Sequence, residues 1–171
     1  MLRKLQPASP EDAVALAALH NAVADHLTQQ HGHGPWSSRT TERSVLTAMR
    51  TSRIFLVRAG AEIVATFRFA TKKPWAIDPS YFSARCKSLY VLSMAVTPAR
   101  QRQGIGRWCL EQAKQVAREW PAEAIRLDAY AGDGGAGRFY ARCGFREVGR
   151  VTYRKAPLIY YELLLQPSVT S

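Results

Sequence analysis

The chain has 171 residues, of which 47% are hydrophobic and 22% are charged, as in an ordinary globular protein. This length suits one domain with a sizeable core, so we predict a single domain over residues 1–171. The chain lacks the apolar run of about 18 residues that a membrane span needs. Its first residues also lack the apolar stretch of a secretory signal. We therefore expect a cytoplasmic protein without membrane contact.

The chain is strongly basic, with 24 lysines and arginines against 13 aspartates and glutamates and a formal charge of +11. Such a charge favours anionic partners, among them nucleic acids, membrane surfaces and phosphorylated cofactors. The basic residues are spread along the sequence and form no block or tail. Charge alone therefore does not choose between these partners and a solvated basic surface.

The three cysteines are widely spaced and form no Cys-x-x-Cys pair. We therefore predict neither a metal site nor a disulfide framework. Cys109 and Cys143 fall in apolar helical patterns, so we expect both to be core residues rather than catalytic thiols.

Helical patterns dominate the first fifty residues, after a short predicted strand over residues 2–7. Ser9 has the character of a helix cap and Pro10 that of a first helical residue. Leu16, Leu19, Val23 and Leu27 follow at helical spacing. The segment 30–35 breaks this pattern, and a second, shorter helix is predicted over residues 41–49.

The rest of the chain alternates between strands and helices. In the hairpin strand 62–69, we expect Ile63, Ala65, Phe67 and Phe69 to face one side. In the helix 104–120, the predicted apolar face contains Ile105, Cys109, Ala113, Val116 and Trp120. The predicted strands are 54–57, 62–69, 89–96, 124–130, 145–152 and 158–165, and the predicted helices are 104–120 and 136–143. The element order β-α-α-β-β-β-α-β-α-β-β predicts a domain of the α+β or mixed α/β class.

The segment from Val96 to Arg107 carries the sharpest motif, a strand that leads through a turn with two glycines into an amphipathic helix. The first amides of a helix have no internal partners, and with the helix dipole they form an anion site. Gly104 and Gly106 lack side chains, so a pyrophosphate can approach the backbone closely, and Arg102 and Arg107 can add charge-assisted bonds. A plain glycine-softened junction between strand and helix is the alternative.

Two other phosphate motifs do not fit this turn. A P-loop needs Gly-Lys followed by Ser or Thr, whereas Arg107 follows Gly106 here. A dinucleotide fingerprint needs a third glycine where this chain has Cys109.

The turn resembles the cofactor signature of the GCN5-related N-acetyltransferase (GNAT) family, Gln/Arg-x-x-Gly-x-Gly/Ala. The matching residues are Gln101-Arg102-Gln103-Gly104-Ile105-Gly106. A second family signature, Asn-x-x-Ala-x-x-Phe/Leu-Tyr-x-x-x-Gly-Phe, resembles the segment from Asp133 to Phe145, about thirty residues further on. The resemblance is specific over residues 89–145. It implies a central mixed, mostly antiparallel sheet of six to seven strands flanked by about four helices.

The resemblance also implies the activity, acetyl transfer from acetyl-CoA directly to a primary amine. It assigns the backbone of Met94 and Val96 to the pantetheine arm, and Tyr140 to protonation of the departing thiolate. It assigns the pyrophosphate to the amides of Gln101, Arg102, Gln103, Gly104, Ile105, Gly106 and Arg107. Asp133 departs from the family's asparagine. A carboxylate cannot donate as an amide does, so we expect Asp133 either to contact the cofactor weakly or to cap the following helix.

The sequence leaves several choices open. Tyr140 could instead be an aromatic core residue. The candidate general bases are Asp128, Tyr130, Glu62, His31 and His33, and the residues expected near the acceptor are Trp36, Trp75 and Tyr81. The acceptor itself is a small-molecule or peptide amine that the sequence does not identify, and a homodimer is compatible with the sequence.

Two alternative functions follow from particular features. The first is a CoA-binding module without catalysis, motivated by Asp133. The second is a basic nucleic-acid-binding protein, motivated by the charge. No helix-turn-helix, zinc-finger or RNA-recognition signature supports the second reading, so we expect no specific nucleic-acid partner.

Overall fold

The computed structural model describes residues 4–84 and 86–167, so residues 2 and 3 of the first predicted strand lie outside the described residues. The described part of the chain contains seven strands and four α-helices in the predicted order. They are β1 (Leu5–Pro7), α1 (Ala13–His31), α2 (Glu42–Thr51), β2 (Arg53–Ala59), β3 (Glu62–Ala70), β4 (Ser88–Val96), α3 (Ile105–Glu119), β5 (Ala124–Tyr130), α4 (Gly137–Arg142), β6 (Arg146–Tyr153) and β7 (Ala156–Leu164).

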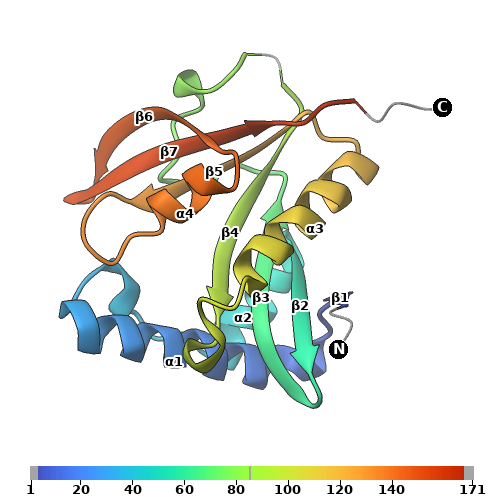
Figure 1. Ribbon diagram of the computed structural model, residues 1–171, viewed down its shortest axis with the longest axis vertical. Coiled ribbons are helices and arrows are strands. Elements are labelled where there is room, and N and C mark those ends of the chain that lie inside the picture. Colours follow the sequence, from blue (N-terminus) through green and yellow to red (C-terminus); the bar gives the residue numbers. More distant parts are fainter. Residues whose placement is uncertain (1–3, 85, 168–171) are drawn as a thin grey trace. The chain divides into compact units, whose positions relative to one another are not determined.

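The strands form one mixed sheet in the order β1-β2-β3-β4-β5-β7-β6. The β4–β5 pair is parallel, whereas β1–β2, β2–β3, β5–β7 and β6–β7 are antiparallel. The hairpins β2–β3 and β6–β7 are visible in Figure 1 as cyan-to-green and orange-to-red pairs. The predicted α+β class, with a mostly antiparallel sheet, is confirmed.

The chain divides into two compact units. Unit 1 consists of Met1–Ala70 and Leu92–Cys109, and unit 2 consists of Thr71–Val91 and Leu110–Ser171. Two of the three boundaries therefore fall inside regular elements, one in β4 and one in α3.

The core of unit 1 lies where the first two helices meet the β2–β3 hairpin. Leu16 and Leu19 of α1 are buried as their spacing predicted, and they join Val45 of α2 and Ile54 of β2 in one cluster. α1 starts later than Ser9 and Pro10 suggested, because the turn Pro10–Asp12 is a 3-10 helix.

Strand β3 differs from the predicted half-exposed strand. Val64 and Thr66, on the face opposite Ile63 and Phe67, are also buried. The Thr66 hydroxyl donates to the Phe55 carbonyl at 2.7 Å, which satisfies this polar group inside the core. Both faces of β3 are therefore covered, a condition that alternation in a single strand cannot reveal.

Helix α3 buries a different stripe from the one predicted. Ile105, Cys109 and Ala113 are buried as expected, but the stripe continues through Ala117 rather than Trp120. Trp120 lies one residue beyond the helix and is 40% exposed, with the Lys87 ammonium 4.6 Å from its ring centroid. The prediction for Trp120 was wrong because its indole lies beyond the last turn of the helix. The buried stripe ends instead at Ala117, whose small side chain fits into the core.

Unit 2 contains a buried ion pair that ties its long connection to the sheet. The guanidinium of Arg126 on β5 donates through Nε to Glu162 on β7 at 2.9 Å, and these residues are only 5% and 2% exposed. Arg126 also donates to the Ser83 carbonyl at 2.6 Å, and the Ser83 hydroxyl donates to Glu162 at 2.6 Å. Ser83, in the connection between β3 and β4, is thus anchored to two strands.

Breaking this buried pair should destabilise the protein more than breaking a surface pair. Arg126→Met leaves the Glu162 carboxylate buried without its cation, so we expect a loss of about 3–5 kcal/mol in the free energy of unfolding. Denaturant titration measures this loss.

The matched control is Arg150→Met. Arg150 binds Glu147 at 2.6 Å, but the two side chains are 64% and 41% exposed, so the loss should stay below about 1 kcal/mol. Equal losses in the two variants would contradict a stabilising role for the buried pair.

Candidate functional site

The predicted anion turn lies in unit 1 and has the geometry that its sequence suggested. After β4 the chain forms the 3-10 turn Pro98–Arg100, and α3 then begins at Ile105. The Trp108 amide donates to the Gly104 carbonyl at 3.0 Å. The amides of Ile105 and Gly106 precede it in the first turn, where helical amides lack intrahelical acceptors. This end of α3 therefore presents donors suited to an anion.

Two residues of this turn have left-handed backbone conformations. Arg102 has φ 60° and Gly104 has φ 76°. A Cβ placed on Gly104 would meet no heavy atom of the described residues within 4 Å. Glycine is therefore favoured at position 104 by its backbone angle and not by crowding within the protein.

Strand β4 is irregular just before the residues expected to bind the cofactor arm. Its register with β5 covers Ser88–Tyr90, and Ser93 has φ 51°, an angle that a regular strand does not adopt. Met94 follows this irregularity. The Val96 carbonyl accepts a hydrogen bond from the Gln101 side chain at 3.1 Å, so the turn is fastened to the end of the strand.

Tyr140 lies in unit 2, on α4, and is only 8% exposed. Its ring centroid is 5.8 Å from that of Phe145 and 6.2 Å from that of Tyr161. Burial raises the pKa of its phenol above the ordinary value, and the neighbouring Asp128 and Cys143 raise the pKa further. The hydroxyl therefore keeps its proton at neutral pH, within an aromatic cluster.

The second signature contains a helix cap. Gly144 has φ 93°, its amide donates to the Ala141 carbonyl at 3.1 Å, and the Phe145 amide donates to the Tyr140 carbonyl at 3.1 Å. These two bonds define a Schellman motif, which requires a left-handed residue after the helix and favours an apolar residue next. The predicted helix stop at Gly144 is confirmed, and the spacing Tyr-x-x-x-Gly-Phe has a structural cause.

The capping role predicted for Asp133 was wrong. The residue that precedes α4 is Ala136, and no side chain caps the helix there. Asp133 is exposed in the preceding turn, four residues before the helix begins, which is too early for a cap.

The candidate bases named from the sequence lie in different settings. Glu62, His31 and His33 are exposed and Tyr130 is half-buried. Asp128 on β5 is half-buried, and its burial raises the pKa of the carboxyl. Asp128 therefore combines partial burial with a raised pKa.

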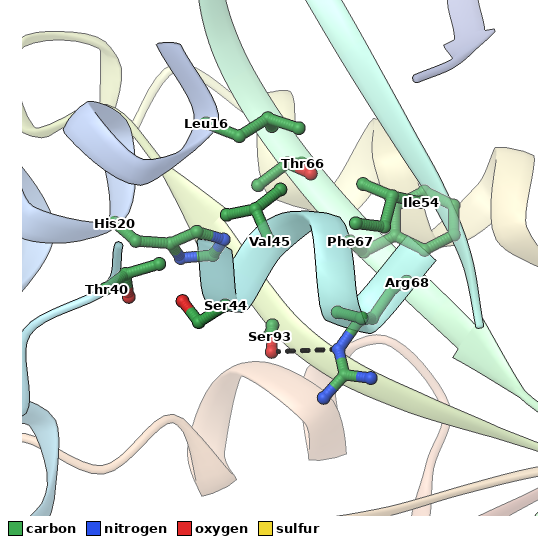
Figure 2. Close-up of a pocket in the computed structure, with 11 residues that line it drawn as sticks. Leu16, His20, Thr40, Ser44, Val45, Ile54, Thr66, Phe67, Arg68 and Ser93 are labelled. Atoms are coloured by element: carbon green, nitrogen blue, oxygen red, sulfur yellow. Dashed lines mark hydrogen bonds between the residues drawn. The ribbon is translucent and has the colours of Figure 1, made fainter. Parts of the chain in front are cut away.

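A cavity of about 200 Å³ in unit 1 brings together side chains that the sequence analysis did not select. Figure 2 shows its lining, with the imidazole of His20 from α1 at one side and Arg68 from β3 at the other. Ser93 of β4 lies beside Arg68, whose Nε donates to the Ser93 hydroxyl at 3.2 Å. The cavity therefore reaches the irregular point of β4.

His20 is the titratable residue of this cavity that can accept a proton at neutral pH. Burial lowers the pKa of its imidazole from 6.5, and the positive charge of Arg68 lowers the pKa further. His20 was missed because it continues the helical pattern of α1 at a position next to Leu19. The available signal was a polar, titratable residue on the edge of the buried helix face.

The wall of this cavity is braced by one amide side chain. Asn21 receives a hydrogen bond from the Thr40 amide at 2.8 Å and donates to the Thr40 carbonyl at 2.9 Å. Thr41 then caps α2 by accepting from the Ser44 amide at 3.1 Å. These bonds hold Thr40 and Ser44 at the cavity.

The aromatic residues expected near the acceptor are not in this cavity. Trp36 lies beyond α1, where its indole donates to the Gly32 carbonyl at 3.1 Å. Trp75 and Tyr81 line an open hollow of about 420 Å³ in unit 2, together with Tyr153 and Tyr160. Trp75 is 87% exposed.

Within the described residues, no group of three or more His, Cys, Asp or Glu side chains is arranged to hold a metal ion. Cys109 and Cys143 are buried, as their patterns predicted, and Cys86 is half-buried. In the same part of the chain, no helix combines the length and apolar character that crossing a bilayer requires.

Comparison with known families gives one match. Residues 18–145 match the sequence model of the Acetyltransferase (GNAT) family. This match covers more than half of the chain and includes both the turn at 101–107 and the segment 133–145. No curated protein matches the chain.

Solved structures share the fold at low sequence identity. An N-acetyltransferase from Staphylococcus aureus has a TM-score of 0.71 at 17% identity, covering 97% of this chain and 100% of that chain. The structure of yncA from Salmonella typhimurium with its cofactor acetyl-CoA has a TM-score of 0.69 at 16% identity, covering 98% and 96%. A ribosomal-protein-alanine N-acetyltransferase from Brucella melitensis has a TM-score of 0.71 at 18% identity, covering 95% and 99%.

Proposed function

Since this chain belongs to the GNAT acetyltransferase family, whose enzymes use acetyl-CoA as co-substrate, we propose that it transfers the acetyl group directly to a primary amine. Direct transfer needs no nucleophile on the enzyme, which fits the burial of Cys109 and Cys143. The observation that carries the proposal is the strand–turn–helix segment 93–107, with its three left-handed residues and its open helix end. Both units belong to one catalytic domain over residues 1–171 in this proposal.

The cofactor contacts follow the family signature. The amides from Gln101 to Arg107 hold the pyrophosphate, and the backbone of Met94 and Val96 pairs with the pantetheine arm. Because the Val96 carbonyl already accepts from Gln101, the Val96 amide and the second lone pair of the carbonyl are the groups left for the cofactor. The exposed carboxylate of Asp133 replaces the family's asparagine as a weak contact.

The acceptor nitrogen must lose protons for transfer to finish. An alkyl ammonium with a pKa of about 10.4 is almost wholly protonated at neutral pH, and the nitrogen becomes far more acidic once it has attacked the thioester. His20 is the base in this proposal because it is unprotonated and lines a cavity that reaches Ser93. Asp128 is the alternative base.

Tyr140 acts at the other end of the reaction, where the thiolate of CoA departs. The thiolate of CoA is a weaker base than the phenolate of a buried tyrosine, since an ordinary thiol has a pKa of about 8.5. Free phenolate is therefore not formed, and Tyr140 donates a hydrogen bond that strengthens as the carbon–sulfur bond breaks. The contacts with Phe145 and Tyr161 hold the Tyr140 ring in place. The same contacts are those of a core residue, so packing is the competing role of Tyr140.

Three points remain predictions: a cytoplasmic location, a homodimer, and an acceptor that is either a small molecule or a peptide. Acetyl-CoA binding without thiol release across a broad amine panel would favour the non-catalytic module. Sequence-selective DNA or RNA binding that survives physiological salt would favour the nucleic-acid alternative.

The turn can be tested by giving Gly104 a side chain. In Gly104→Val, a β-branched residue must adopt φ 76°, so the turn shifts and its amides no longer converge. We expect acetyl-CoA affinity to fall at least about tenfold, or about 1.4 kcal/mol, measured by calorimetry. Gly60→Val is the matched control, because Gly60 has φ 63° and equally open surroundings in the β2–β3 turn. A folded Gly104→Val protein with unchanged affinity would contradict the proposed cradle.

Tyr140 can be tested by removing one oxygen atom. Tyr140→Phe preserves the aromatic cluster, so we expect the fold and acetyl-CoA affinity to persist. Thiol release should slow by about 10²–10⁴, the usual contribution of a general acid. Turnover equal to that of the original protein would leave Tyr140 with a packing role.

His20 can be tested through the pH dependence of kcat, which reports ionisations in the substrate-bound enzyme. A base works when unprotonated, and the pKa of His20 is lowered from 6.5. We therefore expect kcat to fall as the pH drops below 6.5, and this fall should be absent in His20→Gln. His26→Gln, on the same helix and outside the cavity, should keep the original profile. If the pH profile of kcat is unchanged in His20→Gln, His20 is not the general base and Asp128 becomes the candidate.

A further inference from the structure

The cavity of unit 1 contains a cation whose recorded partners are all neutral. Arg68 donates from Nε to the Ser93 hydroxyl at 3.2 Å and from Nη1 to the Ser52 hydroxyl at 3.1 Å. Within residues 4–84 and 86–167, no carboxylate forms an ion pair with it. Two neutral hydroxyls thus hold the guanidinium in place and leave its charge uncompensated.

Several other arginines have an acid as their partner. Four form ion pairs, namely Arg39 with Asp25, Arg58 with Asp12, Arg126 with Glu162, and Arg150 with Glu147. Arg68 is partly buried, and burial lowers its pKa. A cation that is withdrawn from water without a counter-charge costs free energy. Such a cost is offset when an anionic ligand enters the cavity.

The rest of the cavity supports an anion and contains no competing acid. Its lining has no aspartate or glutamate, and it includes four hydroxyl side chains, from Thr40, Ser44, Thr66 and Ser93. Its remaining titratable group, His20, is uncharged at neutral pH. The lining of the cavity therefore contains a positive charge and no negative one. The Ser93 hydroxyl, which accepts from Arg68, can donate its own proton to a further oxygen atom.

The size and position of the cavity limit the ligand. A cavity of about 200 Å³ lies below the range of about 300–1,000 Å³ that is typical of sites for drug-sized molecules. Arg68 contacts Ser93, the residue before Met94, so an anion on Arg68 lies close to the proposed binding site of the pantetheine arm. The amine and the anionic group of the acceptor must then be separated by only a few bonds.

We propose that the acceptor is a small primary amine that also carries a carboxylate, as a free amino acid does, and that Arg68 binds this carboxylate. This inference rests on the proposed acetyl transfer and specifies its acceptor. Arg68 is a binding residue here, since a planar guanidinium matches the two oxygens of a carboxylate. A peptide amino terminus or a protein lysine lacks a carboxylate next to its amine and is excluded as the preferred acceptor.

The test compares acceptors that differ only in charge. The twenty common amino acids, their amides and two aminophosphonates are assayed for thiol release from acetyl-CoA. We expect at least one amino acid to be acetylated with a kcat/KM about tenfold or more above that of its amide. If an aminophosphonate is preferred over every amino acid, Arg68 binds a phosphonate group and the proposal that it binds a carboxylate is wrong.

The variants then locate the preference. Arg68→Gln should raise the KM for the amino acid about tenfold or more and leave the KM for the amide unchanged, so that the preference disappears. Arg50→Gln removes the same charge from an exposed position on α2 and should leave the preference intact. Thermal unfolding and acetyl-CoA calorimetry on Arg68→Gln establish that the fold and the cofactor site persist.

The outcomes separate two failures. If amides or neutral amines are acetylated as well as amino acids, or if Arg68→Gln keeps the preference, the carboxylate inference is wrong and the acetyltransferase proposal stands. If acetyl-CoA binds but no amine in this panel or in a panel of polyamines and peptides releases thiol, the proposed function itself fails.

Discussion

A few left-handed backbone positions determine where this protein presents its reactive groups. Gly104 turns the chain so that α3 begins with its amides directed outward, and Arg102 adopts a similar angle two residues earlier. Ser93 interrupts the regular path of β4 beside a cavity, and Gly144 ends α4 after Tyr140. Regular strands and helices satisfy their own backbone groups. Donors become available to ligands where that regularity stops, which is why the chemistry gathers at these positions.

The buried titratable groups of the two units differ in their protonation. Unit 1 contains positive charge without acids in its cavity, and its imidazole is kept neutral by burial and by Arg68. Unit 2 contains a tyrosine that keeps its proton because burial and Asp128 disfavour the phenolate. A proton acceptor and a proton donor are the two groups that amide formation from a thioester requires. The overall charge of +11 is thus less informative than the Arg68 guanidinium, which lines a cavity without an acidic side chain.

Much of the fold was predictable from the sequence because local patterns decide local structure. The element order was correct, β5 was predicted at its observed bounds, and Gly144 marked a helix end. The wrong predictions concern burial, because they depend on which other elements pack against a strand or helix. Val64 and Thr66 are buried because both faces of β3 are covered, and Trp120 is exposed because it follows the last turn of α3. Neither fact is encoded within the segment itself.

The candidate site was predictable only where chemistry follows a contiguous motif. The turn at 101–107 is contiguous, so its residues could be named in advance. The cavity is assembled from α1, α2, β2, β3 and β4, and no single segment indicates that His20 and Arg68 line it. The candidates His31, at the end of α1, and His33, just after it, are both exposed, although a base needs a partly buried setting to be tuned.

The helix cap at Gly144 has a consequence for how such sequences are interpreted. The glycine supplies the left-handed angle, and Phe145 packs against Tyr140 while its amide binds the Tyr140 carbonyl. Selection for a well-formed helix end would preserve this spacing even in a descendant that had stopped turning over its substrate. The motif therefore reflects ancestry and architecture, and within it only the phenolic oxygen has a role in the proposed reaction.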